Sequence, residues 1–222
     1  MHTVDQVILT RRFGLTRDLV RRLVVLATGL LLLGIGISMT ARSNLGLGPW
    51  SVLHDGISRH TGLALGTVDI LVGIPVLILW IPLGERPGIA TILSAFEVGL
   101  SINLGLLLIP SVQAPLPATA LLIAGVLVAA FGSSLYLTAN LGRGPRDGLM
   151  VGVHRRSGIG LGRIRTGIEL TVLALGIVLG GRFGIGTVAY ALIIGPALAG
   201  FLLVLRRRGM RLEVRAPVST EP

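Results

Sequence analysis

Long apolar segments separated by short polar or charged stretches dominate this chain. A bilayer core of about 30 Å needs about 20 helical residues at 1.5 Å each. Six segments approach or reach that length: Leu23 to Thr40, Leu63 to Leu83, Gly88 to Ile109, Ala118 to Leu137, Gly162 to Leu179 and Gly184 to Leu205. The pattern predicts an all-α membrane protein with six transmembrane helices.

Composition supports this class and excludes others. Of 222 residues, 52% are apolar and 14% charged, and the mean hydropathy of +0.84 exceeds that of soluble domains. The sequence has no cysteine, so disulfides and thiolate metal sites are excluded. It also has no lysine, P-loop, HExxH or GxSxG motif, and His54 and His60 lack the spacing of helical metal ligands. We therefore expect no enzyme activity, no cofactor and no metal site.

All 20 basic residues are arginine, and their positions predict the orientation. Counted on alternate sides of the six spans, seventeen arginines lie on one side and three on the other. Positively charged flanks stay in the cytoplasm. We therefore expect both termini to be cytoplasmic, with basic tails at 1–22 and 206–222. Because the charge flanks apolar spans, it indicates a lipid bilayer as partner and no nucleic acid.

The chain contains an internal repeat at an offset of 96 residues. Asn44-Leu-Gly-Leu-Gly-Pro49 recurs as Asn140-Leu-Gly-Arg-Gly-Pro145, and Gly88 and Thr91 recur as Gly184 and Thr187. The repeats at 23–110 and 118–205 hold three spans each. Because three is odd, the second copy enters the membrane from the opposite side, which predicts two inverted three-helix repeats. Such repeats are a recurrent design of transporters.

A short helix should follow each Gly-Pro pair, since proline suits the first helical position. Thirteen residues are too few to cross the bilayer, so each of these half-helices either lies at the interface or dips into the membrane and returns. If both dip in, their amino-termini offer N–H groups to an anionic or polar solute. The alternative is a connecting turn whose glycines only permit packing.

Acidic residues inside the spans are further candidates, because a charge at mid-bilayer is costly. Glu97 lies nine residues into its helix and has Ile193 as its counterpart in the second repeat. We expect it to carry a proton or cation, to contact a solute, or only to pack in protonated form. Arg165 stands four residues before Glu169 and should pair with it.

These considerations give fourteen candidate substrate-binding residues. They comprise the two repeated loops with their first helical turns and the charges inside the spans: Asn44, Gly46, Gly48, Pro49, Trp50, Glu97, Asn140, Gly142, Gly144, Pro145, Arg146, Asp147, Arg165 and Glu169.

The runs Ala41 to Gly56, Gly66 to Gly73, Asn140 to Met150, Arg165 to Glu169 and Gly184 to Thr187 resemble the YczE branch of the YczE/YyaS/YitT family of bacterial multi-pass membrane proteins. The resemblance covers about residues 20 to 205 and implies a protein of the bacterial inner membrane. That family has no established biochemical activity. Its members often carry aspartate after Gly-Pro-Trp, where this chain has Ser51, so only Asp147 is acidic at the two equivalent positions.

The leading functional hypothesis is a permease or exporter of an unknown small solute, with its site between the repeats. The alternative is an accessory or anchoring protein for a biosynthetic or signalling complex. A polar cavity at the midplane favours the first and a dry core the second. Six helices are often too few to enclose a path, so a homodimer is an open alternative.

Overall fold

The computed structural model describes residues 2–208, and the side chains of residues 17–208. The helices are α1 (His2–Arg42), α2 (Pro49–Thr61), α3 (Leu65–Ile78), α4 (Trp80–Leu83), α5 (Ile89–Leu108), α6 (Pro115–Thr138), α7 (Pro145–Ser157), α8 (Leu161–Val178) and α9 (Ile185–Arg207). No strand occurs in the described range. The predicted all-α class is confirmed.

Five segments are long and apolar enough to cross a membrane, namely Arg17–Arg42, Leu65–Leu83, Ile89–Leu108, Pro115–Thr138 and Ile185–Arg207. The 18-residue α8 occupies the place of the predicted fifth span, but Arg163, Arg165 and Glu169 lie within it. The sixth crossing therefore stays a prediction. The predicted tail at 1–22 is helical from His2 onward, as the beginning of α1, whereas the tail at 206–222 is described only as far as residue 208.

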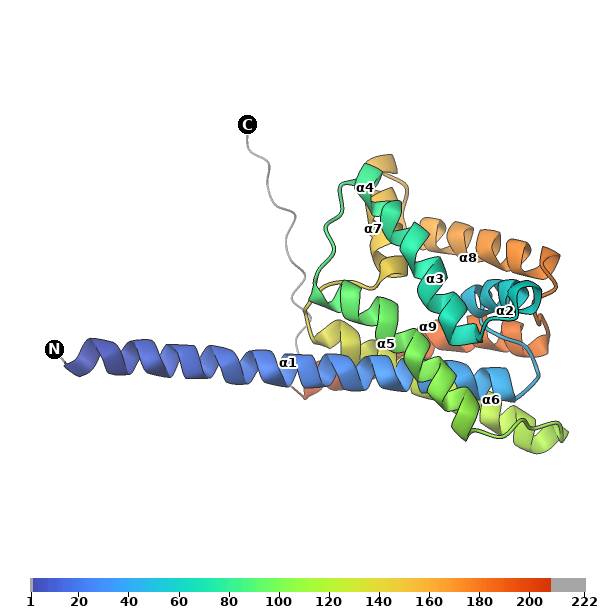
Figure 1. Cartoon of the computed structure of the whole chain (residues 1–222), viewed down its shortest axis with the longest axis horizontal. Coiled ribbons are helices and arrows are strands. Elements are labelled where there is room, and N and C mark those ends of the chain that lie inside the picture. Colours follow the sequence, from blue (N-terminus) through green and yellow to red (C-terminus); the bar gives the residue numbers. More distant parts are fainter. Residues whose placement is uncertain (1, 209–222) are drawn as a thin grey trace.

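Helices α1 and α6 make the most extensive contact among the described helices and run in opposite directions (Figure 1). Glycine allows their backbones to approach closely. A Cβ built on Gly36 would lie 2.5 Å from the nitrogen of Ala129, and one built on Gly132 would lie 2.5 Å from the nitrogen of Leu33. Gly36 and Gly132 are equivalent in the sequence repeat, as are Leu33 and Ala129. Equivalent residues of α1 and α6 therefore make equivalent close contacts with the other helix.

The sequence repeat recurs as a repeat of helix boundaries. Helices α2 and α7 begin at Pro49 and Pro145, and the starts of α3 and α8, and of α5 and α9, have the same offset of 96. Asn44 and Asn140 both have positive φ, at 57° and 55°. The same sequence motif therefore gives the same local backbone in both halves.

Each half also supplies a hydrogen-bond acceptor to the first turn of a helix in the other half. The backbone N–H of Ala90 in α5 donates to the carbonyl of Leu141 at 3.1 Å, and that of Gly186 in α9 donates to Leu45 at 2.8 Å. These bonds satisfy first-turn N–H groups that have no partner within their own helix. In Figure 1, α1 and α5 run from left to right, whereas α6 and α9 run from right to left.

Candidate functional site

A cavity of about 190 Å³ lies where the first turns of α2 and α7 approach each other. Helices from both halves contribute to it: α1, α3, α5, α6, α8 and α9 also line its wall. Its polar and charged lining residues are Ser51, His54, Asp69, Ser94, Ser133, Tyr136, Arg146, Asp147, Arg165, Glu169 and Tyr190, with the indole of Trp50 beside them. A cavity that holds charged and polar side chains among apolar ones, inside a bundle of apolar helices, is a candidate binding site.

The lining follows the sequence repeat. Equivalent residues 96 apart face the cavity as the pairs Gly48 and Gly144, Pro49 and Pro145, Trp50 and Arg146, Ser51 and Asp147, His54 and Met150, Asp69 and Arg165, Gly73 and Glu169, Ser94 and Tyr190, Ala95 and Ala191, and Val98 and Ile194. Equivalent positions of the two halves therefore line the cavity, but most of them carry different side chains.

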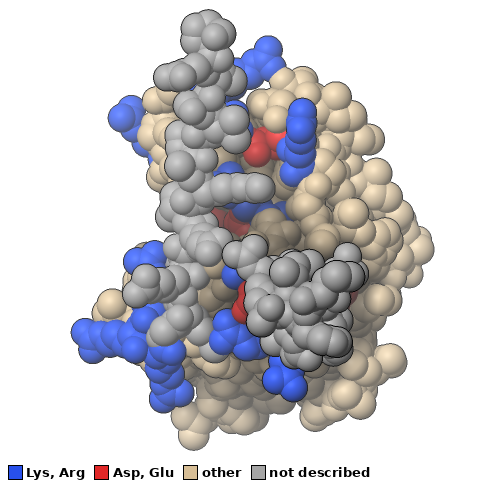
Figure 2. Space-filling view, turned by 90° about the vertical axis from the view of Figure 1, so that its left-hand side faces the viewer, with Lys and Arg blue, Asp and Glu red and all other residues tan. Residues whose placement is uncertain are grey.

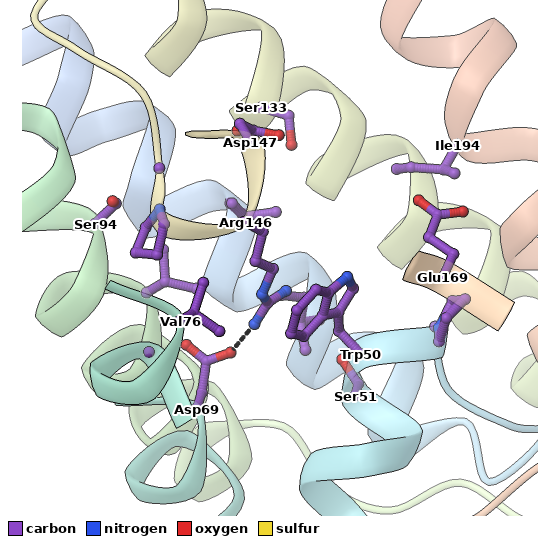
Figure 3. A pocket seen from close by; sticks show the side chains of 18 of the residues that line it. Trp50, Ser51, Asp69, Val76, Ser94, Ser133, Arg146, Asp147, Glu169 and Ile194 are labelled. Carbon is purple, nitrogen blue, oxygen red and sulfur yellow. Dashed lines mark hydrogen bonds and ion pairs between the residues drawn. The ribbon is translucent and has the colours of Figure 1, made fainter. Parts of the chain in front are cut away.

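A first charged cluster joins α2, α3 and α7. Arg146 forms an ion pair with Asp69 (Figure 3), and its guanidinium carbon lies 4.9 Å from the centre of the Trp50 ring. Nδ1 of His54 lies 3.2 Å from an Asp69 oxygen. Burial lowers the pKa of His54 below its usual value, so the ring is neutral and its Nδ1–H donates to the Asp69 carboxylate.

A second cluster joins α6, α7 and α8. The Tyr136 hydroxyl donates to the Asp147 carboxylate. Arg165 donates to Glu169 at 2.9 Å within α8, which is the pair predicted from their spacing. Burial raises the pKa of Asp147 to about 6, against the opposing effect of Arg165. Figure 3 shows Asp147 and Ser133 together on one side of the pocket and Trp50 with Ser51 on another.

The first turns of α2 and α7 are not capped by side chains. Gly48 and Gly144 are the N-cap residues, and no side chain bonds to either cap. Free N–H groups at a helix amino-terminus carry a partial positive charge that favours an anion or a carbonyl. The cavity thus combines two such termini with ionisable side chains of both signs.

Comparison with known proteins places the chain in a family. Residues 20–202 match the model described as "Family of unknown function (DUF6198)". The chain belongs to the DUF6198 family. An uncharacterized protein of Haemophilus influenzae is 36% identical over 183 residues, which are 82% of this chain and 84% of that relative. The uncharacterized membrane protein YczE of Bacillus subtilis is 30% identical over 185 residues, 82% of this chain and 86% of YczE.

The uncharacterized protein YyaS of Bacillus subtilis is 28% identical over 183 residues, 81% of this chain and 91% of YyaS. No solved structure matches the chain. The resemblance to the YczE and YyaS group is confirmed, and this DUF6198 protein is a multi-pass membrane protein.

Nine of the fourteen predicted site residues line the cavity of the DUF6198 protein. They are Gly48, Pro49, Trp50, Gly144, Pro145, Arg146, Asp147, Arg165 and Glu169. They come from the two Gly-Pro turns and from α8, so the structure brings together residues that lie up to 121 positions apart in the sequence.

The other four loop residues lie outside the lining. Gly46 and Gly142 have positive φ, at 124° and 129°. A Cβ on Gly46 would lie 2.7 Å from the Thr187 hydroxyl, so this glycine lets its loop pass close to the start of α9. Asn44 joins three loops, since its amide donates to Ser111 at 2.7 Å and its carbonyl oxygen accepts from Arg182 at 3.2 Å. Asn140 is equivalent to Asn44.

Glu97 is half-buried on α5 and is not among the residues that line the cavity. Its two neighbours in the sequence face opposite ways. Val98 is 6% exposed and lines the cavity, whereas Phe96 is 55% exposed on the outer surface. The carboxyl groups that reach the cavity are those of Asp69 in α3, Asp147 in α7 and Glu169 in α8 instead. A role for Glu97 stays a prediction.

Sequence reasoning missed Asp69, His54, Tyr136 and Tyr190 as site residues. Asp69 is an acidic residue within an apolar span, like Glu97, and it stands at the position equivalent to Arg165. Applying the offset of 96 to Arg165 would have found it. Tyr136 and Tyr190 are the chain's two tyrosines, but their equivalents, Thr40 and Ser94, gave no such signal.

Proposed function

We propose that this protein is a small-solute permease of the bacterial inner membrane, with its binding site between two inverted repeats. The observation that carries the proposal is the cavity lined by equivalent positions of both halves. Two related halves around one site allow a rocking motion that exposes the site to each side in turn. A protein that only anchors a complex needs no polar cavity at this place.

The inverted arrangement is supported by three features of the described residues. Helix starts recur at an offset of 96, the cross-bonds of Ala90 and Gly186 are reciprocal, and corresponding long helices run in opposite directions (Figure 1). As the sixth span, α8 would turn Arg165 and Glu169 to the cavity and leave Leu170 and Val178, which are 60% and 83% exposed, to lipid.

Arginine placement supports cytoplasmic termini. The amino-terminal end of α1 and the loop before α5 lie at the left of Figure 1, and the loops after α1 and after α5 lie at the right. Figure 2 looks onto the left-hand side and shows arginine side chains spread over that face, with acidic side chains among them. A face rich in arginine belongs on the cytoplasmic side.

One observation favours the second candidate, an accessory or anchoring protein. The amino-terminal part of α1 extends well beyond the other helices in Figure 1. A projecting cytoplasmic helix could bind a soluble partner without any movement of solute. The two functions differ in whether water reaches the cavity from both sides of the membrane.

Cysteine accessibility tests the permease proposal, since the native chain has no cysteine. We would place single cysteines at Ala95 and Ala191, which are equivalent and both line the cavity. Leu100→Cys is the control, because Leu100 lies in the middle of α5 and is 61% exposed on the apolar surface. A membrane-impermeant thiol reagent is added from either side of oriented membrane vesicles.

The expected result is that Ala95→Cys and Ala191→Cys react from both sides, whereas Leu100→Cys reacts from neither. Reaction of the cavity cysteines from one side alone, or from neither side, would overturn the permease proposal and favour the accessory protein. Immunoblotting of each variant in the membrane fraction confirms that it is inserted.

A further inference from the structure

The first turns of α2 and α7, which line the cavity at equivalent positions, differ in charge. Asp147 lies in the first turn of α7, where its carboxylate faces the partial positive charge of that helix terminus. The equivalent residue in α2 is Ser51, and α2 has no acidic residue in its first turn. The amino-terminus of α2 is therefore left with a positive potential that no acidic side chain of its own first turn neutralises.

The arginines of the cavity are engaged, whereas one carboxylate is not. Arg146 is paired with Asp69, and Arg165 is paired with Glu169 at 2.9 Å. Among the described residues Asp147 has no ion pair, and its recorded hydrogen bond comes from the Tyr136 hydroxyl. An ionised Asp147 would leave the cavity with one excess negative charge, which a cation can neutralise.

Two buried polar atoms in the cavity wall lack partners. The indole Nε1–H of Trp50 and the Nε2 of His54 have no hydrogen-bond partner within the described part of the chain, and these side chains are 9% and 1% exposed. Because the Nδ1–H of His54 donates to Asp69, its Nε2 is an acceptor. Both residues line the cavity, so its wall contains one unsatisfied donor and one unsatisfied acceptor.

Given the proposed permease function, we propose that the solute is a small zwitterion with an ammonium and a carboxylate group, as in an amino acid. Its ammonium group binds Asp147 and Tyr136. Its carboxylate binds the first-turn N–H groups of α2 and the Ser51 hydroxyl, beside Arg146. Pockets for drug-sized ligands have about 300–1,000 Å³, so the cavity of about 190 Å³ limits the solute to a small one.

Binding is tested with matched compounds that differ only in their charged groups. The probes are L-alanine, L-leucine and L-phenylalanine, each compared with its decarboxylated amine and its deaminated acid. Affinities are measured by calorimetry on the full-length protein in lipid nanodiscs at pH 7. At least one of the amino acids is expected to bind at least tenfold more tightly than its own amine and its own acid.

Two variants assign the ends of the ligand. Asp147→Asn should weaken binding of the amino acid at least tenfold and leave binding of the acid unchanged. Ser51→Ala should weaken the amino acid and the acid severalfold and leave the amine unchanged. Asp18→Asn is the matched control, because Asp18 pairs with the neighbouring Arg21 and Arg22 on α1 and does not line the cavity, and it should bind like the native protein.

Equal affinity for an amino acid and its amine would overturn the zwitterion and indicate a cationic solute. Equal affinity for an amino acid and its acid would overturn it in favour of an anionic solute, and binding of no probe would also overturn it. Cysteines at 95 and 191 that react from both sides would then leave the permease proposal standing. If they react from one side only, the permease proposal itself is wrong.

Discussion

Three nitrogens of Arg182 donate hydrogen bonds to the carboxylate of Asp55. Its Nε and one terminal nitrogen donate to Oδ1 at 3.1 and 2.9 Å, and its backbone N–H donates to Oδ2 at 2.9 Å. Asp55 lies in α2 of the first half and Arg182 lies between α8 and α9 of the second. This pair joins the halves at one face, while Arg155 and Glu85 join them elsewhere, with Arg155 63% exposed.

Asp55→Asn should lower the free energy of unfolding by up to about 3 kcal/mol, because it leaves the guanidinium of Arg182 without its buried carboxylate. Glu85→Gln should cost less than 1 kcal/mol, since its partner Arg155 is largely exposed. Unfolding in mild detergent, followed by circular dichroism, measures both. A loss for Glu85→Gln as large as that for Asp55→Asn would contradict this ranking.

The same pair predicts how stability changes with pH. Burial acts to raise the pKa of Asp55, but the bonds from Arg182 and Arg59 outweigh it and hold the pKa below the usual 3.8. A carboxyl group with a depressed pKa stabilises the fold above that usual value, and the stabilisation is lost as the pH falls through the lowered pKa. Asp55→Asn should remove this acid sensitivity below about pH 4.

Gly148→Ala should displace Trp80 or α7. A Cβ built on Gly148 would lie 1.9 Å from the ring of Trp80, and that ring is anchored because its Nε1–H donates to the Pro145 carbonyl at 2.9 Å. We expect a loss of about 1–3 kcal/mol from overpacking and a changed emission of Trp80. Fluorescence of the Trp50→Phe background, which leaves Trp80 as the only tryptophan, measures the second effect.

Gly167→Ala is the control for that experiment. Gly167 is also helical, in α8, but nothing lies within 4 Å of its Cβ position. Alanine is a better helix former than glycine by about 1 kcal/mol, so this variant should be at least as stable as the native protein. Equal effects of the two substitutions would show that Trp80 does not pack on α7 as described.

Asn44 combines a backbone role with a side-chain role, which two substitutions separate. Its φ of 57° is favoured by glycine and tolerated by asparagine, and its amide donates to Ser111 and Val112 at 2.7 and 3.1 Å. Asn44→Gly should lose the side-chain bonds alone, about 1–2 kcal/mol. Asn44→Ala should lose about 1 kcal/mol more. Thermal unfolding midpoints should therefore fall in the order Asn, Gly, Ala; an equal fall for both would contradict the strain at this position.

Binding of an ammonium group should depend on the ionisation of Asp147. Burial raises the pKa of this carboxyl to about 6, so its ionised fraction falls about tenfold between pH 7 and pH 5. Affinity for the zwitterionic probe should fall by the same factor over this range. Asp147→Asn should abolish the pH dependence, whereas a dependence that survives in this variant would assign it to another group.

The regular part of the architecture followed from the sequence. The offset of 96 predicted that the helix starts at Pro49 and Pro145 are equivalent, because Gly-Pro turns and positive-φ asparagines fix the backbone locally. The all-helical class is confirmed and five spans meet the length and hydropathy that a membrane requires. The count of six and the inversion stay predictions, since they depend on how α8 meets the bilayer.

The site could be predicted less completely, because side chains meet there across long sequence separations. Nothing in the spacing of Asp69 and Arg146 indicates that α3 packs against α7. Glu97 and Asp69 look alike in sequence, as single carboxyl groups in apolar spans, yet the helical face of each decides whether it reaches the cavity. That face depends on the packing of α3, α5 and α7 together.

The reciprocal bonds of Ala90 to Leu141 and of Gly186 to Leu45 make the two halves depend on each other. Each half caps a helix of the other, so neither half is a complete folding unit by itself. A single copy of the repeat would leave the corresponding first-turn N–H group without this acceptor, so the two copies are expected to fold together rather than one after the other.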